Sequence, residues 1–414
     1  DEMIDVAKEM EKNEIRVPLL IGGATTSRVH TAVKIEQALP SSQAIHVLDA
    51  SRSVTVAGSL LGKGKEDFLA KTKSEYQTLR DYHAKKKDQK SFLTIEQARK
   101  NKFQINWTNY NPTKPKKMGS HVWYDLPLEE IVPYIDWTPF FQTWELYGRF
   151  PKILNDEIVG LEAQKLYDDA QKVLSKVIEE NTIQVDVVYG FWQAFSDQND
   201  DIHLINEKGE AIAKSHTLRQ QTSKSAKAKN MALSDFIRPK SDEATDYLGA
   251  FVVSAGKNVA DIAKQYEEDL DDYSSIMIKA IADRIAEAAT EYLHEKVRKE
   301  FWGYASNESF NNEELIREKY SGIRPAPGYP ACPDHTEKQT IFKLLNAEEN
   351  IGVTLTESLA MFPASSVSGW YFAHPDAKYF GLGKIKKDQV TDLAKRKAVD
   401  EAVMLKWLAP NLDD

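Results

Sequence analysis

The sequence predicts two parts: a partial, doubly wound (Rossmann-like) α/β unit, then a larger α+β domain with an antiparallel sheet and long helices. Three observations support this fold class. Helical and strand patterns alternate over residues 1–61, a lysine-rich polar stretch lies at residues 85–90, and the remainder mixes strands and helices without regular alternation. A chain of 414 residues also usually divides into two or three domains.

The first unit alternates helix, strand, helix, strand, helix. Apolar residues recur at helical spacing over residues 1–13, and residues 17–21 and 45–48 are short apolar runs typical of buried parallel strands. Ser27 can cap the helix between these strands, and a further apolar helix is expected at 54–61. Because two strands rarely make a stable parallel sheet, the rest of this sheet is expected to lie upstream of Asp1 or to come from another chain, and we favour the first of these.

Small residues follow both strands of this unit. Gly22 and Gly23 follow the first strand, and Ala50 follows the second. Ligands of doubly wound folds sit at the carboxyl ends of the strands, where glycine lets them approach the backbone. The pattern is not GxGxxG, so nothing indicates a nicotinamide cofactor. A ligand-binding loop and a plain turn with a helix cap are equally good interpretations.

A helix and a polar stretch separate this unit from the larger domain. An apolar stripe predicts a helix at 65–82, and we place the first unit at 1–84, a linker at 85–99 and the second domain at 100–414. In the second domain the pattern predicts strands and helices without βαβ alternation, which favours an antiparallel sheet. The strands are expected at 185–189, 202–205, 248–254 and 367–372, and the helices at 155–180, 274–302 and 388–408.

The single cysteine and the net charge of −9 exclude some kinds of site and argue against some kinds of partner. Because Cys332 is alone, the chain can form neither an intrachain disulfide nor a multi-thiolate zinc site, which agrees with a reducing, cytoplasmic location. The acidic balance argues against a nucleic-acid partner. No apolar run approaches the ~20 residues that a membrane helix needs, so no membrane partner is expected. No metal site is expected within the chain.

The densest local signal is the ten-residue run RPAPGYPACP, from Arg324 to Pro333. Four prolines fix the backbone and remove donors, which predicts a stiff loop whose carbonyls are free to accept a donor or face a cation. Gly328 is the one position suited to positive φ. Arg324 offers a planar fork for a carboxylate. A plain connection between two helices is the simpler interpretation of the same run.

Two further segments combine aromatic and polar residues. Residues 134–147 are rich in aromatic side chains, which usually form core, and Asp136 among them needs a cationic partner or a ligand ammonium. Residues 366–380 predict a strand, a turn at His374, and then Tyr379 and Phe380. Neither segment indicates a function by itself.

Together these segments resemble the C-terminal part of the cobalamin-dependent methionine synthase family, over essentially the whole chain. The run from residue 17 to 35 resembles the end of its cobalamin-binding domain, and the proline run is specific to its reactivation domain. The resemblance implies that Gly22, Gly23 and Ala50 lie against the buried nucleotide tail of cobalamin. It also implies that the cobalt-ligating histidine lies upstream of this chain, so neither His30 nor His46 takes that role.

The resemblance further implies a site for S-adenosyl-L-methionine. Asp136 would hold the ammonium of its methionine part, and Arg324 would hold the carboxylate. The proline-rich loop, with Gly328 and Tyr329, would lie along the adenosine and the sulfonium.

Four more residues complete the expected site. Tyr379 and Phe380 would close the pocket, although Phe380 stands where the family has a tyrosine. Glu287 and Glu318 are further polar candidates. Cys332 with nearby His335 could be imagined as a nucleophilic pair, but the family uses none there, and no catalytic residue is expected.

The implied activity belongs to the whole enzyme. The family transfers a methyl group from 5-methyltetrahydrofolate to homocysteine through cobalamin. This part would bind S-adenosylmethionine and support reductive methylation of cob(II)alamin, with a flavodoxin-type protein as electron donor. Zinc and the sites for homocysteine and methyltetrahydrofolate would lie in the missing N-terminal part, whose domains would be the partners of this one. The methyltransferase fragment is not expected to turn over alone.

Two other functions are compatible with the residues. The chain could be a non-catalytic docking module for a corrinoid protein and its flavodoxin-type reductase. An autonomous S-adenosylmethionine methyltransferase for small substrates would normally carry a glycine-rich strand-end motif, and the sequence has none.

Overall fold

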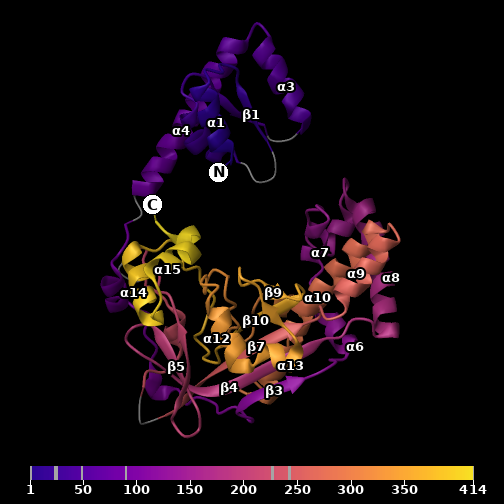
Figure 1. Ribbon diagram of the computed structural model, residues 1–414, viewed down its shortest axis with the longest axis vertical. Helices are drawn as coiled ribbons and strands as arrows, with labels where there is room; N and C mark the ends of the chain where they lie inside the picture. Colours follow the sequence, from indigo (N-terminus) through magenta and orange to yellow (C-terminus); the bar gives the residue numbers. More distant parts are fainter. Residues whose placement is uncertain are drawn as a thin grey trace. The chain divides into compact units, whose positions relative to one another are not determined.

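The computed structural model describes residues 2–22, 27–47, 50–88, 91–224, 228–240 and 244–413. The chain forms two compact units, Asp1–Ser91 and Phe92–Asp414 (Figure 1). The stretch predicted as a linker contains regular structure, because α4 (Lys65–Asp88) reaches into it and α5 (Ile95–Lys100) begins within it. None of the helices in the described ranges is both long and apolar enough to cross a membrane.

The first unit contains the predicted alternation. Two parallel strands, in which Leu19 lies opposite Ala44, pack with helices around a small core that includes Ile21 and Ile35. The Ser27 hydroxyl accepts a hydrogen bond from the His30 N–H at 3.1 Å, as its predicted capping role requires. The elements are α1 (Glu2–Lys12), β1 (Leu19–Ile21), α2 (Arg28–His30), a π-helical turn (Thr31–Ile35), β2 (Ala44–His46), α3 (Ala50–Leu61) and α4.

The second unit is built on the predicted antiparallel sheet. Its strand order is β10-β7-β4-β5-β6, and β3 also pairs with β4. The strands are β3 (Gly119–Trp123), β4 (Asp186–Ser196), β5 (Asp201–Ile205), β6 (Ala211–His216), β7 (Asp246–Ser254) and β10 (Ser366–Tyr371). A separate hairpin joins β8 (Thr354–Leu355) to β9 (Met361–Phe362).

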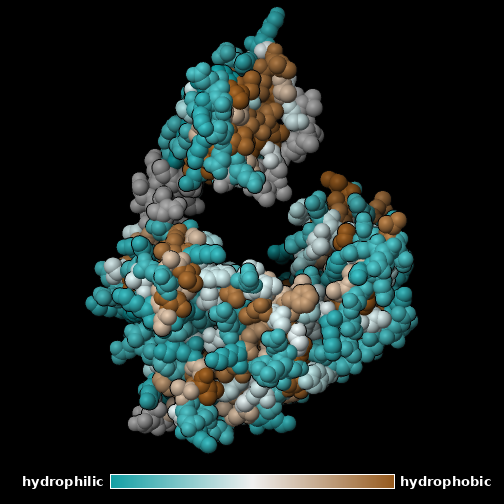
Figure 2. All heavy atoms as spheres, in the orientation of Figure 1, coloured by the Kyte–Doolittle hydropathy of each residue, from teal (hydrophilic) through white to brown (hydrophobic). Residues whose placement is uncertain are grey.

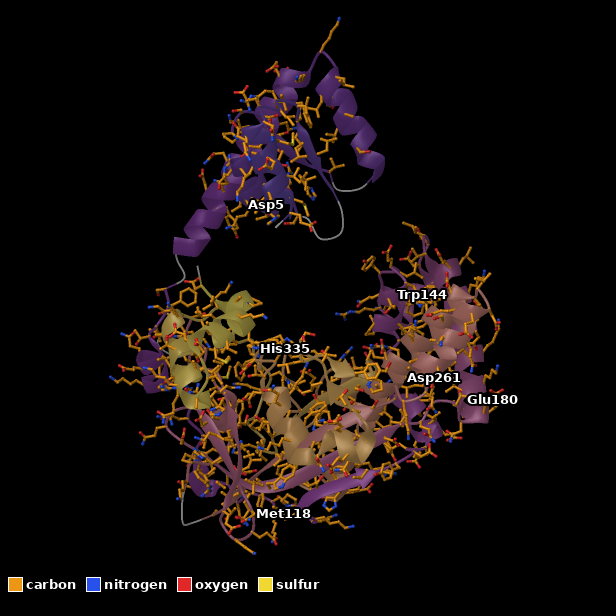
Figure 3. The ribbon with its side chains drawn as sticks, viewed as in Figure 1. Asp5, Met118, Trp144, Glu180, Asp261 and His335 are labelled. Atoms are coloured by element: carbon orange, nitrogen blue, oxygen red, sulfur yellow. The ribbon has the colours of Figure 1, made fainter. Side chains whose placement is uncertain are left out.

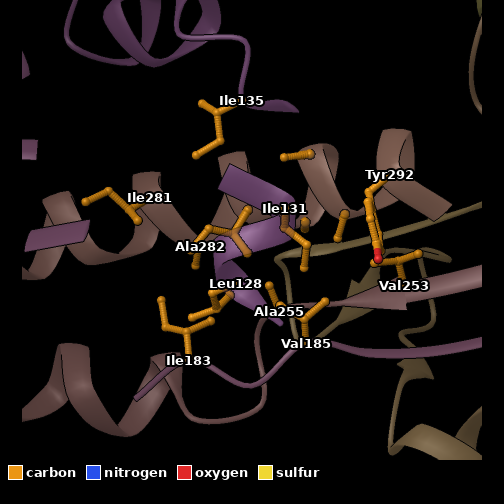
Figure 4. Packing of buried hydrophobic residues seen from close by; sticks show 14 of the residues in the cluster. Leu128, Ile131, Ile135, Ile183, Val185, Val253, Ala255, Ile281, Ala282 and Tyr292 are labelled. Carbon is orange, nitrogen blue, oxygen red and sulfur yellow. The ribbon is translucent and has the colours of Figure 1, made fainter. Parts of the chain in front are cut away.

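Helices cover both faces of this sheet, because the side chains of its central strands alternate between two cores. In β7, Val253 belongs to the core that contains α10 (Asp272–Lys296), whereas Val252 belongs to the core that contains α12 (Glu337–Leu345). Figure 4 shows Ile281 of α10 in the first core, together with Ile131 and Val253. The other helices of this unit are α6 (Leu128–Ile131), α7 (Thr138–Thr143), α8 (Gly160–Glu180), α9 (Val259–Glu268), α11 (Asn312–Ile316), α13 (Ala347–Ile351), α14 (Lys387–Lys397) and α15 (Glu401–Leu408).

The predicted strands and two of the three predicted helices of this unit are present, with shifted ends. The single helix expected at 388–408 is wrong: α14 ends at Lys397, and the φ of +54° at the next residue, Ala398, breaks the helical path before α15. The sequence pattern also missed β3 and β6, whose side chains are largely exposed or half-buried and therefore show little apolar alternation. The long helix ends in a π-helical turn, Val297–Phe301.

The burial of Asp246, at the start of β7, predicts that the free energy of unfolding depends on pH. Its carboxylate is 5% exposed and accepts hydrogen bonds of 2.8 Å from the N–H groups of Arg238 and Tyr247. Burial raises the pKa of this carboxyl from its ordinary 3.8 to about 6. Because the folded-state pKa is the higher one, the stabilising contribution is complete below the unfolded pKa and is lost as the pH rises through about 6.

We therefore expect Asp246→Asn to flatten the pH dependence of unfolding. Between about pH 4.5 and about pH 6.5 the wild-type chain should lose about 2 kcal/mol of unfolding free energy more than the variant does. Urea unfolding at the two pH values measures this difference. Asp261→Asn removes an exposed carboxylate of α9 (Figure 3) and should leave the dependence unchanged. Equal slopes for the wild type and Asp246→Asn would contradict the prediction.

Candidate functional site

The proline run, residues 324–333, is hydrogen-bonded to β10 at the edge of the sheet, and we call it the strap. Ile323, just before it, pairs with Phe372 after β10. The Trp370 N–H donates to the Pro325 carbonyl at 3.0 Å, and the Leu382 N–H donates to the Pro330 carbonyl at 2.8 Å. Gly369 of β10 makes room for this crossing, because a Cβ there would lie 2.9 Å from the Pro325 oxygen.

A tight turn closes the middle of the strap. The Gly328 N–H donates to the Cys332 carbonyl at 2.7 Å, and the Cys332 N–H donates to the Tyr329 carbonyl at 2.9 Å. Gly328 has a φ of +98°, as predicted, and a Cβ there would lie 2.5 Å from the His335 ring (Figure 3). The expectation of free carbonyls is wrong at Pro325, Tyr329, Pro330 and Cys332, because backbone N–H groups already use these oxygens.

The first cavity beside the strap has a volume of about 500 Å³ and mostly apolar walls. The strap forms one side through Pro325, Ala326 and Tyr329. Tyr379 and Phe380, which follow β10 and its turn, line the cavity as well. Its other lining residues are Phe251, Glu287, Thr290, Glu318, Arg324, Pro330, Ala331, Val367 and Gly381.

A second cavity of about 390 Å³ adjoins the first and is more polar. Asp136, just before α7, lines this second cavity together with Glu291 of α10. Both cavities share the lining residues Glu287, Glu318, Arg324 and Tyr329. The structure therefore brings Asp136 and Tyr379, which lie far apart in the sequence, to two neighbouring cavities that both contain Arg324 in their walls.

Arg324 is held at the junction of the two cavities. Its guanidinium forms an ion pair with Glu291 at 2.6 Å and donates to the Tyr320 hydroxyl at 2.9 Å. The same Nη1 lies 3.0 Å from Nδ1 of His294. The Arg324 N–H also donates to the Tyr379 hydroxyl at 3.0 Å. Burial alone would lower the pKa of Arg324, but the Glu291 charge, the Tyr320 and Tyr379 side chains and the hydrogen bond to Glu291 together outweigh it, so the pKa is raised and the side chain stays cationic.

One carboxylate oxygen of Asp136 accepts no hydrogen bond from any described residue. Its Oδ1 accepts the Thr138 N–H at 2.9 Å, a bond that fixes the carboxylate at the start of α7. Within the described ranges of the chain no cationic side chain forms an ion pair with Asp136. The carboxylate is therefore available to a cation that enters the second cavity.

Residues 127–398 match a family model described as the activation domain of vitamin B12-dependent methionine synthase. The chain belongs to this family. A solved structure, the MetH reactivation domain bound to AdoHcy, is similar to it with 49% sequence identity and a TM-score of 0.75. The match covers 78% of this chain and 99% of that one. The resemblance seen in the sequence is thereby confirmed for the activation domain.

In this activation domain, Phe380 packs by its ring. It is 8% exposed, belongs to the core that contains α12, and its ring centre lies 6.4 Å from that of Phe236. Ring packing at this position needs no hydroxyl. Cys332 is also buried, and burial raises the pKa of its thiol, so the protonated form predominates and a nucleophilic role is disfavoured.

Three predicted residues belong to the first unit, outside the activation domain. Gly22 follows β1, and Ala50 is the first residue of α3. A Cβ at Gly22 would lie 3.5 Å from the Val47 carbonyl, an ordinary contact. Gly23 lies outside the described residues. Among the residues that are described, no three His, Cys, Asp or Glu side chains gather to hold a metal ion.

Sequence reasoning missed the residues that hold Arg324. Glu291 and His294 lie three positions apart on α10 and therefore on one face of that helix. Tyr320 precedes Arg324 by four residues. The spacing on α10 was readable, but nothing local indicated that this face of the helix meets the strap of the activation domain.

Proposed function

We propose that the second unit binds S-adenosylmethionine across the two adjoining cavities and presents its methyl group for reactivation of cobalamin. The observation that carries this proposal is the placement of Asp136 and Arg324, of opposite charge, on the wall of one polar cavity that shares four lining residues with an apolar one. The solved relative is bound to AdoHcy, which is what remains when S-adenosylmethionine loses its methyl group.

The charges of the ligand match those of the site. The ammonium of the methionine part pairs with Asp136, and the carboxylate pairs with Arg324, whose planar guanidinium suits it. Glu287 and Glu318, on the wall common to both cavities, supply negative charge near the sulfonium. The adenosine lies in the apolar cavity, along Tyr329 of the strap and against Tyr379 and Phe380. Gly328 lines neither cavity and instead shapes the turn that carries Tyr329.

The residues of this site orient and hold; they need not move a proton. S-adenosylmethionine, when bound, supplies a methyl group activated by the sulfonium charge. The chain holds both charged groups on the α-carbon of the methionine part and the adenosine on the other side of the sulfonium, so that the methyl group points in one direction and its transfer becomes effectively unimolecular. No catalytic acid or base is required. The electron for reductive methylation comes from a flavodoxin-type donor.

For the first unit we propose the end of a cobalamin-binding domain, a partial doubly wound sheet within residues 1–84 that is joined through 85–99 to the domain at 100–414. Its two parallel strands end side by side, where such folds bind ligands, and Gly22, Gly23 and Ala50 follow those ends. The cobalt-ligating histidine, the zinc site and the sites for homocysteine and methyltetrahydrofolate belong to upstream domains. The methyltransferase activity is proposed for that whole assembly, in the cytoplasm.

Calorimetry tests the binding proposal. The wild-type chain should bind S-adenosylmethionine at a single site, and Asp136→Asn should weaken binding about tenfold, because a charged hydrogen-bond pair is worth about 1.5–3 kcal/mol. 5′-Methylthioadenosine lacks the amino-acid part, and its affinity should be the same for both proteins. If Asp136→Asn left the affinity for S-adenosylmethionine unchanged, the placement of the ammonium would be wrong.

A docking module without ligand chemistry is the second candidate. Ile158, Leu161 and Leu270 are each 92% exposed, and Figure 2 shows apolar residues gathered near α7 and α9. Exposed apolar residues of this kind are typical of a protein interface. If S-adenosylmethionine produced no heat of binding and no thermal shift, docking would be favoured as the sole function.

A further inference from the structure

The donors of Arg324 are only partly used inside the protein. A guanidinium has five N–H groups. Nη1 donates one to Tyr320, at 2.9 Å, and directs the other at Nδ1 of His294, at 3.0 Å. Nη2 forms an ion pair with Glu291, at 2.6 Å, which occupies a third. No described residue accepts the remaining two, on Nε and Nη2, which form the second fork of the guanidinium.

His294 is a buried, neutral acceptor. Its side chain is 0% exposed, and its ring lies against Tyr371, with ring centres 5.3 Å apart and planes 16° apart. Tyr320 meets it edge-on at 4.8 Å. Burial, and then the charges of Arg298 and Arg324, lower the pKa of His294 well below its usual value. Nδ1 therefore accepts from Arg324, and the ring proton is on Nε2, which lies 3.5 Å from the Tyr304 hydroxyl.

Because Arg324 is paired with Glu291, the direction of its remaining N–H groups matters more for ligand binding than its charge does. Because the Glu291 carboxylate already balances the Arg324 charge, the residual attraction for a second carboxylate is weakened. Binding of the ligand carboxylate then depends on the direction in which the two N–H groups without a described acceptor point. An end of the guanidinium that is held by two acceptors cannot turn without breaking both bonds.

We propose that His294 is a positioning residue for the carboxylate of S-adenosylmethionine: it holds Nη1 of Arg324, so that the free fork of the guanidinium faces the cavity. This inference rests on the proposed function. His294 does not touch the ligand and acts only through Arg324. A purely structural role in the core would affect every ligand of the site alike.

Two ligands and two variants separate these roles. Decarboxylated S-adenosylmethionine keeps the ammonium and the sulfonium but offers nothing to the fork of Arg324. His294→Phe keeps a ring and loses the acceptor, and should weaken S-adenosylmethionine binding about tenfold, the loss of one hydrogen bond to a charged group, while the decarboxylated ligand changes less than about twofold. His294→Asn, with an acceptor near the Nδ1 position, should recover most of the loss.

The matched control is His374→Phe. His374 is also buried and accepts a hydrogen bond, from the Asp376 N–H at 3.0 Å, but it lines neither cavity. Its loss should change neither affinity. Should His294→Phe fail to fold, His294→Gln, which moves the acceptor toward the Nε2 position, provides the same comparison.

The outcomes distinguish this inference from the proposed function. Equal weakening of both ligands by His294→Phe, or no change in either, would overturn the positioning role while the site stands. If the wild-type chain bound no S-adenosylmethionine, the proposed function would fail, and this inference with it.

Discussion

Arg324→Ala is expected to weaken S-adenosylmethionine binding by about 1.5–3 kcal/mol, a roughly 10- to 150-fold higher Kd. The variant removes the fork that receives the ligand carboxylate. Of the ion pairs that Glu291 makes with described residues, the variant leaves only the one with Arg298, at 3.8 Å, in the wall of the cavity. The bare Glu291 carboxylate then repels the ligand carboxylate, so the loss should exceed that of one neutral hydrogen bond. Isothermal calorimetry at constant ionic strength measures it.

Two comparisons sharpen this test. Arg284→Ala removes another arginine from the wall of the same polar cavity and should leave the Kd nearly unchanged. Arg324→Lys retains the charge but cannot bond Glu291, Tyr320 and His294 while presenting a fork, so it should recover little of the loss. If Arg284→Ala abolished binding and Arg324→Ala did not, the carboxylate would have been assigned to the wrong arginine.

The largest effect on stability is expected from Arg219→Met. Arg219 is 1% exposed and forms a two-pronged pair with Asp235, at 2.7 and 2.8 Å. Its Nε donates to Asp200 at 2.9 Å. Asp200 and Asp235 are also buried, so among the described residues removing the cation leaves Asp235 without a counterion and Asp200 with Arg99 alone. Breaking a buried pair of this kind costs about 3–5 kcal/mol.

Urea unfolding of the second unit measures this loss. Lys172→Ala is the control, because Lys172 forms an exposed pair with Asp169 and should matter by less than about 1 kcal/mol. Arg219 lines neither ligand cavity, so the folded variant should keep the wild-type Kd for S-adenosylmethionine. A loss of less than about 1 kcal/mol for Arg219→Met would mean that the buried carboxylates find other partners.

The sequence predicted the elements with strong periodicity. In β7 the apolar run is nearly continuous, and in α10 apolar residues recur over 25 residues, so the pattern was unambiguous. The proline strap and its positive-φ glycine follow from single-residue chemistry, which needs no tertiary information. The break at Ala398 could not be predicted, because alanine favours helix and only the tertiary packing sets its left-handed backbone.

Only the residues expected to touch the ligand could be predicted from the sequence, not the residues that hold them in place. Asp136 and Arg324 stand out locally, as an acid among aromatic rings and a cation before four prolines. Their convergence on one hollow depends on how α10 crosses the sheet, which no local pattern encodes. For the same reason Glu291 and His294 passed as ordinary helical residues, although one helix face brings both to the guanidinium.

The most direct test of the account is a crystal structure of the chain with S-adenosylmethionine. We predict the ligand ammonium at Asp136, its carboxylate on the free fork of Arg324, and its adenosine in the apolar cavity beside the strap and Tyr379. Ligand density elsewhere on the molecule, with both cavities filled only by water, would contradict the assignment of the site.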